Sequence, residues 1–116
     1  MVVTDLQNLV RYRPTIAEQS GPFSKYVVFV SSDGQSFTLR RESAELSLKF
    51  WELLNSGSSS NRYNTYYLPD LNGEMLELAA MYLTHESHYM EEDFEPYEAP
   101  KGKEKFLEDI RNIITA

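Results

Sequence analysis

The sequence contains no cysteine, which excludes disulfides, thiolate metal sites and cysteine nucleophiles. No apolar run approaches the roughly 20 residues of a bilayer-spanning helix, and the N-terminus lacks the basic-then-apolar pattern of a secretory signal. Basic residues are also few: acidic residues outnumber them 18 to 11, and the net charge of −7 repels phosphate backbones. We therefore expect a soluble, intracellular protein that binds neither nucleic acid nor membranes.

The composition is that of one folded domain preceded by an N-terminal extension. At 116 residues, 41% of them apolar and 25% charged, the chain is long enough for a single hydrophobic core. Within residues 1–25, the spacing of Val3, Leu6, Leu9 and Val10 indicates a short helix, and prolines and a glycine then interrupt regular structure. We divide the chain into the extension, either ordered or partly disordered, and a domain over residues 26–116.

Two strands are expected at the start of this domain. Residues 26–30 and 36–40 are rich in β-branched and aromatic residues, and Asp33-Gly34 between them is a strong hairpin signal. The second strand alternates polar and apolar residues, as a strand with one solvated face does. The first strand is apolar on both faces: Tyr26, Val28 and Val30 on one, Val27 and Phe29 on the other. Its second face must therefore be covered either by the rest of the chain or by a partner protein.

A helix and a further short strand are expected in the middle of the chain. The helix spans residues 43–55, in one piece or in two pieces with Ser47 capping the second. Its core-facing stripe follows helical spacing and consists of Leu46, Phe50, Leu53 and Leu54. The strand covers residues 66–68 and ends at Pro69, which has no N–H to donate to a neighbouring strand.

Two longer helices complete the predicted fold. The first begins at a cap formed by Asp70 or Asn72 and runs to about residue 87. It is apolar around most of its circumference, so we expect it to be buried on more than one side. The second spans about residues 103–114 and carries one apolar stripe, which consists of Phe106, Leu107, Ile110, Ile113 and Ile114.

The sequence offers little for catalysis or for metal binding. The only histidines, His85 and His88, stand three residues apart on a predicted helix. A zinc site would need a third protein ligand, and two exposed histidines near a helix end are the simpler interpretation. No serine lies in a nucleophile-elbow motif, and no glycine-rich segment resembles a phosphate-binding loop. We expect no enzyme, no cofactor and no metal, but a protein that binds others through apolar helix surfaces.

From residue 26 onward the chain resembles elongin C, the small BTB/POZ-fold adaptor of cullin ubiquitin ligases. The resemblance rests on Ser31-Ser32-Asp33-Gly34, on Met81-Tyr82-Leu83-Thr84 and on the joint Pro96-Tyr97-Glu98-Ala99-Pro100 before the last helix. In addition, Leu68-Pro69-Asp70-Leu71 is similar to the strand-to-helix corner of BTB domains. The resemblance implies an α+β, BTB/POZ-like fold, with a small three-stranded sheet flanked by a cluster of helices.

The resemblance also implies three partners and a location in the nucleus and cytoplasm. An elongin B-like ubiquitin-fold protein would contact the sheet through Tyr26, Val28, Val30 and Phe37. The helix of a BC-box or SOCS-box receptor would lie against Leu78, Tyr82, Tyr97, Phe106, Leu107 and Ile110. A cullin would contact Asn55, Arg62, Tyr63 and Tyr89. Leu78, Phe106 and Leu107 are equally explained as core residues, and Tyr82 is the strongest candidate for direct contact.

Two other interpretations stay open. The chain is alternatively an adaptor of the Skp type, which binds F-box proteins, or a self-associating BTB module without a role in ubiquitin transfer. Skp-type adaptors continue with further helices beyond the position of Ala116, which favours elongin C. The chain departs from elongin C in its long extension, in Asn72-Gly73 at the start of a helix, and in the polar residues of the last helix.

Overall fold

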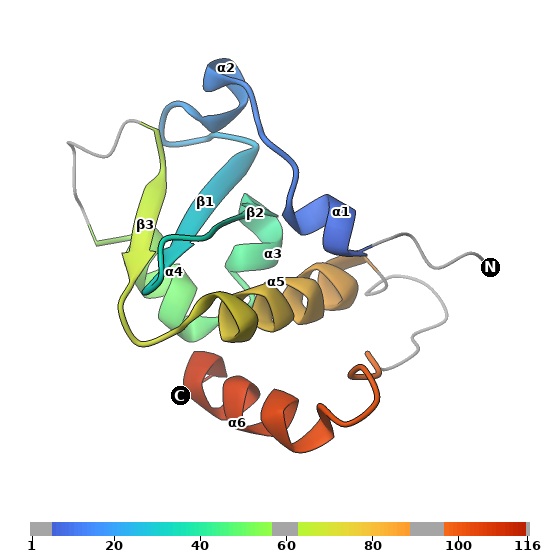
Figure 1. The fold of residues 1–116 in the computed structure, drawn as a ribbon. Helices are drawn as coiled ribbons and strands as arrows, with labels where there is room; N and C mark the ends of the chain where they lie inside the picture. Colours follow the sequence, from blue (N-terminus) through green and yellow to red (C-terminus); the bar gives the residue numbers. More distant parts are fainter. Residues whose placement is uncertain (1–5, 57–62, 89–96, 116) are drawn as a thin grey trace.

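The computed structural model describes residues 6–56, 63–88 and 97–115 of the chain (Figure 1). The elements follow one another as α1 (Leu6–Val10), α2 (Ile16–Gln19), β1 (Tyr26–Ser31), β2 (Ser36–Arg40), α3 (Arg41–Ala44), α4 (Leu48–Leu54), β3 (Thr65–Leu68), α5 (Gly73–His88) and α6 (Glu104–Thr115). In Figure 1, α5 lies between the sheet and α6, so the domain has a layer of strands, a central helix and an outer helix.

The central strand of the three-stranded sheet is β1, in the order β2-β1-β3. It pairs antiparallel with β2 and parallel with β3. In the hairpin between β1 and β2, the Ser31 N–H donates to the Gln35 carbonyl at 2.9 Å. Gly34 has a φ of 84° there, a conformation that glycine adopts without strain. The predicted hairpin, the three-stranded sheet and the α+β class are all confirmed.

The strand register separates two faces of the sheet. On the core face, Val27 and Phe29 pair with Leu39 and Phe37 of β2, and all four side chains are buried. The Phe29 ring stacks on Phe50 of α4, with 4.4 Å between the ring centroids. The opposite side, here called the outer face, carries Tyr26, Val28 and Val30 of β1, Ser36, Thr38 and Arg40 of β2, and Thr65 and Tyr67 of β3.

The predicted middle helix consists of two pieces, α3 and α4. Ser47 is the N-cap of α4, where its hydroxyl accepts the Phe50 N–H at 3.2 Å, as predicted. Phe50 is fully buried, and Leu53 and Leu54 pack partly buried against the core. Leu46, however, is 40% exposed. The prediction that Leu46 faces the core is wrong, because it lies in the turn between the two helices, where helical spacing does not apply.

The central helix α5 packs against α1, α3, β2 and α6. Asn72 caps its start, since the Asn72 side chain accepts the Met75 N–H at 2.9 Å. Leu76, Ala79 and Ala80 are fully buried, which confirms that α5 is covered on more than one side. A Cβ at Gly73 would lie 2.0 Å from Gln35 Nε2, so a larger residue there would require the flexible Gln35 side chain to move.

The last helix, α6, is amphipathic. Leu107, Ile110 and Ile114 are its buried residues, and Phe106 and Ile113 pack partly buried against the same core. The five residues form the predicted stripe, and α6 uses it to pack against both α4 and α5.

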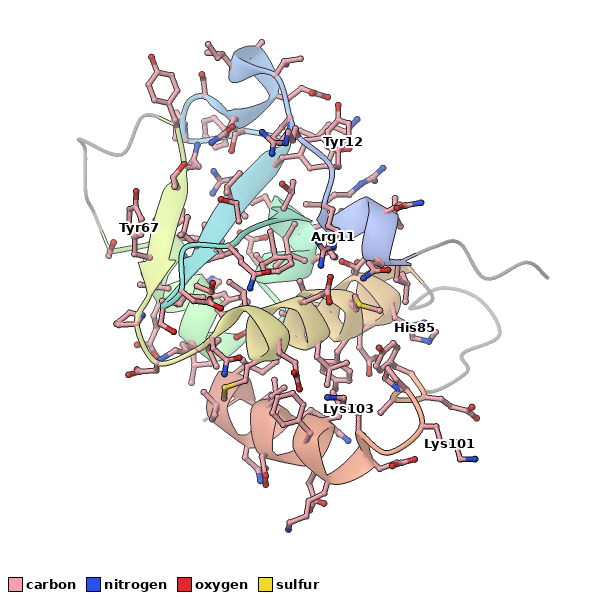
Figure 2. The ribbon with its side chains drawn as sticks, viewed as in Figure 1. Arg11, Tyr12, Tyr67, His85, Lys101 and Lys103 are labelled. Atoms are coloured by element: carbon pink, nitrogen blue, oxygen red, sulfur yellow. The ribbon has the colours of Figure 1, made fainter. Side chains whose placement is uncertain are left out.

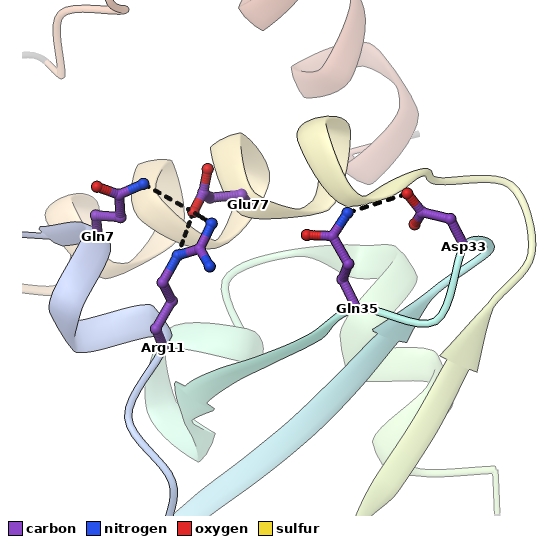
Figure 3. A network of polar contacts seen from close by, with 5 residues as sticks. All are labelled: Gln7, Arg11, Asp33, Gln35 and Glu77. Atoms are coloured by element: carbon purple, nitrogen blue, oxygen red, sulfur yellow. Dashed lines mark hydrogen bonds and ion pairs between the residues drawn. The ribbon is translucent and has the colours of Figure 1, made fainter.

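The N-terminal extension packs against the domain. Helix α1, which confirms the short helix expected before residue 11, buries Val10 completely in the same core as the strands. Arg11 Nε donates to the Glu77 carboxylate of α5 at 2.7 Å, and Gln7 Nε2 donates to the same oxygen at 3.3 Å (Figure 3). Residues 6–11 are therefore joined to α5 by an ion pair as well as by apolar packing.

Candidate protein-binding surfaces

The seam between α5 and α6 gathers the residues predicted for the BC-box contact. Tyr82 of α5 meets Tyr97 edge to face, with 6.1 Å between the ring centroids. His85, one turn further along α5, lies 5.5 Å from the same Tyr97 ring. From α6, the Arg111 guanidinium stands over the Tyr82 ring, 5.3 Å from its centroid. Aromatic rings therefore form the rim of this seam, with cations over two of them: Arg111 over Tyr82 and Lys103 over Phe106.

The six predicted residues of the seam lie at two depths. Tyr82, Tyr97 and Phe106 are partly exposed, so their rings are accessible to another molecule. Leu78 and Leu107 are only 6% and 7% exposed, and Ile110 is fully buried. These three aliphatic residues belong to the core of the free chain, because α6 packs against α5 and covers them. A ligand that approaches the closed seam meets the three aromatic rings first.

The tyrosine hydroxyls of the seam are held in their neutral form. Desolvation raises the pKa of Tyr82, the Glu86 carboxylate adds to the rise, and Arg111 opposes it. Desolvation also raises the pKa of Tyr97, with a further contribution from the negative charge of Glu77. Both hydroxyls therefore remain able to donate a hydrogen bond at physiological pH, and each ring offers an apolar body with a polar tip.

The outer face of the sheet holds three of the four residues predicted for the elongin B-type contact. Tyr26 and Val30 are partly exposed and Val28 is 8% exposed. Phe37 is different: it pairs with Phe29 on the core face and is 1% exposed. Its ring is covered by the Arg11 guanidinium, 5.6 Å from the centroid. The structure therefore separates Phe37 from the other three and assigns it to the core.

Two of the four residues predicted for the cullin contact can be located. Asn55 is exposed at the end of α4, where its side-chain amide donates to the Trp51 carbonyl at 2.8 Å. Tyr63 is 45% exposed just before β3. The other two, Arg62 and Tyr89, lie outside the described residues.

Sequence reasoning missed an exposed apolar pair on the same helix. Leu48 and Trp51 are 47% and 45% exposed, and their spacing of three residues places them on one side of α4. Both lie outside the core-facing stripe of this helix, and this position in the pattern could have identified them as exposed from the sequence alone. A tryptophan that does not take part in core packing is typical of protein interfaces.

The described part of the chain contains no group of three or more potential metal ligands among its histidine, aspartate and glutamate side chains. The side chain of His88 lies outside what is described. The interpretation of His85 and His88 as two exposed histidines near a helix end therefore stays a prediction. Within the same described ranges, no helix is both long and apolar enough to cross a bilayer.

The order β2-β1-β3, the parallel β1–β3 pair and the helices that follow define a BTB/POZ-like fold of the elongin C type. Among solved structures, the chain is similar to one from the "Crystal structure of Rad7 and Elc1 complex in yeast", at a TM-score of 0.54 and 19% identity. The similarity covers 78% of this chain and 99% of that one, and Elc1 is the yeast elongin C. The elongin C-like fold predicted from the sequence is therefore confirmed.

No protein-family model matches this chain. A search of curated proteins also found no matching sequence.

Proposed function

We propose that this chain is a non-catalytic adaptor that links a BC-box or SOCS-box substrate receptor to a cullin ubiquitin ligase. The elongin C-like fold supports the adaptor role, since elongin C proteins are non-catalytic adaptors. In the yeast structure, Elc1 is found in a complex with Rad7. By the same resemblance, we propose that the protein acts in the nucleus and cytoplasm.

The receptor contact is proposed at the seam between α5 and α6. The observation that supports it is the cluster of Tyr82, Tyr97 and Phe106, three partly exposed aromatic rings above a buried aliphatic layer. An amphipathic helix binds such a surface by laying its apolar side chains against the rings. Each leucine buried in this way gains roughly 1.5–3 kcal/mol, so a few of them are enough to anchor a receptor helix.

Two further contacts belong to this proposal. An elongin B-like ubiquitin-fold protein would bind the outer face of the sheet at Tyr26, Val28 and Val30. The cullin would bind beside α4, near Asn55 and Tyr63, and the exposed pair Leu48 and Trp51 extends this surface by two apolar side chains.

The adaptor role is tested by calorimetry with the purified chain and two synthetic peptides, one BC-box helix and one F-box helix. We expect the BC-box peptide to bind and the F-box peptide to bind at least tenfold more weakly, a difference of about 1.4 kcal/mol. Preference for the F-box peptide would instead identify a Skp-type adaptor. Light scattering on the same sample provides the third outcome, because a stable homo-oligomer without peptide binding would identify a self-associating BTB module.

A further inference from the structure

Residues 11–21 of the extension, here called the strap, cross the outer face of the sheet. At one side, Thr38 Oγ1 of β2 donates to the Tyr12 carbonyl at 2.6 Å. The Tyr12 ring also packs on the Tyr26 ring of β1, with 5.1 Å between the centroids. The strap therefore begins its crossing at the β2 side of the sheet.

The strap ends its crossing at β3. Gln19 Nε2 donates to Thr65 Oγ1 at 3.0 Å. The Asn64 side-chain amide donates to the Gln19 and Gly21 carbonyls at 2.7 and 2.8 Å. Val28 pairs with Thr38 on one side and with Thr65 on the other, so it lies midway between the two attachments. This crossing accounts for the burial of an outer-face valine in a chain without a partner.

Beyond the Arg11–Glu77 ion pair at its start, the strap has its own local structure and is attached at the two sides of the sheet described above. Its helix α2 has no buried residue, and Ile16 within it is 71% exposed. A capping box holds its shape: Glu18 accepts the Thr15 N–H at 2.9 Å, and Thr15 accepts the Glu18 N–H. Segments with few buried apolar contacts open at a lower free energy than the core does. Since Val10 is core, opening would stop at residue 11.

Beyond the strap, the rest of the outer face is open. Val30 is partly exposed and Tyr67 is 72% exposed. Figure 2 shows Tyr67 at the β3 edge of the sheet, away from Tyr12. A hollow of about 780 Å³ runs between the strap and this open part, and both Val28 and Val30 line it. The strap therefore divides the face into a covered half and an accessible half.

We propose that the strap competes within the chain for the face that an elongin B-like partner binds. In the closed state it covers Tyr26 and Val28, and in the open state the whole outer face is available. The partner's apparent affinity is then its intrinsic affinity multiplied by the fraction of open chains. The identity of the partner rests on the proposed function. The opening of the strap does not depend on it.

The opening is tested first, without any partner. Because the chain has no cysteine, Val28→Cys and Val27→Cys each introduce a single reporter thiol, on opposite faces of one strand. We expect Tyr12→Ala to accelerate the reaction of the thiol at 28 with a small aromatic disulfide about tenfold in the native full-length chain, and to leave the rate at 27 unchanged. Equal rates at both positions, with the same dependence on urea, would mean that the face is exposed only by global unfolding and would overturn the proposal.

The competition is tested with recombinant elongin B as the probe. We expect Tyr12→Ala in the full-length chain to bind elongin B several-fold more tightly than the unmodified chain does. Phe23→Ala is the matched control, since this ring belongs to the same extension but is 93% exposed, and it should leave the affinity unchanged. Weaker binding of Tyr12→Ala would make Tyr12 part of the interface and would overturn the competition.

A locked strap gives the converse result. Gln19→Cys and Thr65→Cys replace two side chains that are in contact. A short bis-methanethiosulfonate cross-linker, which forms a disulfide with each thiol and releases sulfinate, should suppress elongin B binding until the disulfides are reduced. Binding of the BC-box peptide to the seam should not change in the locked chain. If elongin B binds neither the unmodified chain nor Tyr12→Ala, the partner assignment of the proposed function fails and the competition fails with it. If elongin B binds but the lock has no effect, the proposed function stands and the strap inference is overturned.

Discussion

Ser47 and Ile114 connect the beginning of one helix with the end of another. The fully buried Ser47 hydroxyl donates to the Ile114 carbonyl of α6 at 2.6 Å while it accepts the Phe50 N–H of α4. A single hydroxyl therefore serves a carbonyl at the end of α6 and an N–H at the start of α4, two groups that lack partners within their own helices. It also fixes the C-terminal end of α6, and thereby one end of the seam.

The first prediction concerns this hydroxyl. Ser47→Ala should lower the free energy of unfolding by about 1–3 kcal/mol, because a buried carbonyl and a helix N–H both lose their partner. Ser56→Ala is the matched control: its hydroxyl also donates to a carbonyl, that of Leu53, but at an exposed site. Urea unfolding followed by circular dichroism measures both. Equal effects of the two substitutions would contradict the special role of Ser47.

The second prediction tests the receptor contact at the seam. Tyr82→Ala should weaken binding of a BC-box peptide by about 1–3 kcal/mol, because the ring is part of the exposed rim. Tyr82→Phe keeps the ring and should lose far less. Tyr63→Ala removes the same side chain from a site away from the seam and should leave the affinity unchanged. Calorimetry that finds equal affinities for Tyr82→Ala and the unmodified chain would place the ligand elsewhere.

The third prediction contrasts two residues that the sequence pattern treats alike. Phe50→Ala should cost about 3–5 kcal/mol of stability, since the ring is fully buried against Phe29. Leu46→Ala should cost no more than about 0.5 kcal/mol, as is usual for an exposed position. Chemical denaturation of both variants measures the difference. A cost of several kcal/mol at Leu46 would show that the turn packs against the core after all.

The fourth prediction concerns pH. A hydrogen bond from Ser31 and another from Gln35 lower the pKa of the Asp33 carboxyl in the hairpin. A carboxyl whose pKa is lower in the folded than in the unfolded chain stabilises the folded protein at pH values above its unfolded pKa of about 3.9. This stabilisation is lost as the pH falls through the folded-state pKa. The stability difference between the unmodified chain and Asp33→Asn should therefore shrink as the pH is lowered from neutral to acid.

Urea unfolding at a series of pH values checks this, and nuclear magnetic resonance titration of the Asp33 carboxyl reports its pKa directly. Gln35→Ala removes one of the two donors and should raise that pKa toward its ordinary value. A stability difference that does not change with pH would mean that the two hydrogen bonds have no net effect on the carboxylate.

Local signals in the sequence predicted most of the fold. The Asp33-Gly34 turn, the Ser47 cap and the apolar stripe of α6 each depend on residues close together in the chain, and all three are found as expected. Leu46 was misassigned because the helical stripe was continued across the Ser47 cap, although that cap marks the turn between α3 and α4. The predictable part is the part that depends on short-range spacing.

The candidate sites were harder to predict because they depend on which face a residue occupies. The hairpin register places Phe37 opposite Phe29 and therefore in the core, whereas the resemblance grouped it with the outer-face residues. The strap left even less of a signal. It is attached through a backbone carbonyl of Tyr12 and the side chains of Gln19 and Asn64, and polar contacts of this kind have no periodicity along the sequence.

Several segments of the chain converge on the side-chain carboxamide of Asn64, just before β3. Asn64 has a φ of 48°, in the left-handed region where few residues other than glycine and asparagine are at ease. Its two amide hydrogens are used by the Gln19 and Gly21 carbonyls, and its oxygen accepts from Arg41 and Tyr66. Glycine would keep the backbone shape but lose all four side-chain hydrogen bonds, and aspartate would face two carbonyls with no hydrogen to donate. Position 64 is thus a place where geometry and chemistry independently demand the same amino acid.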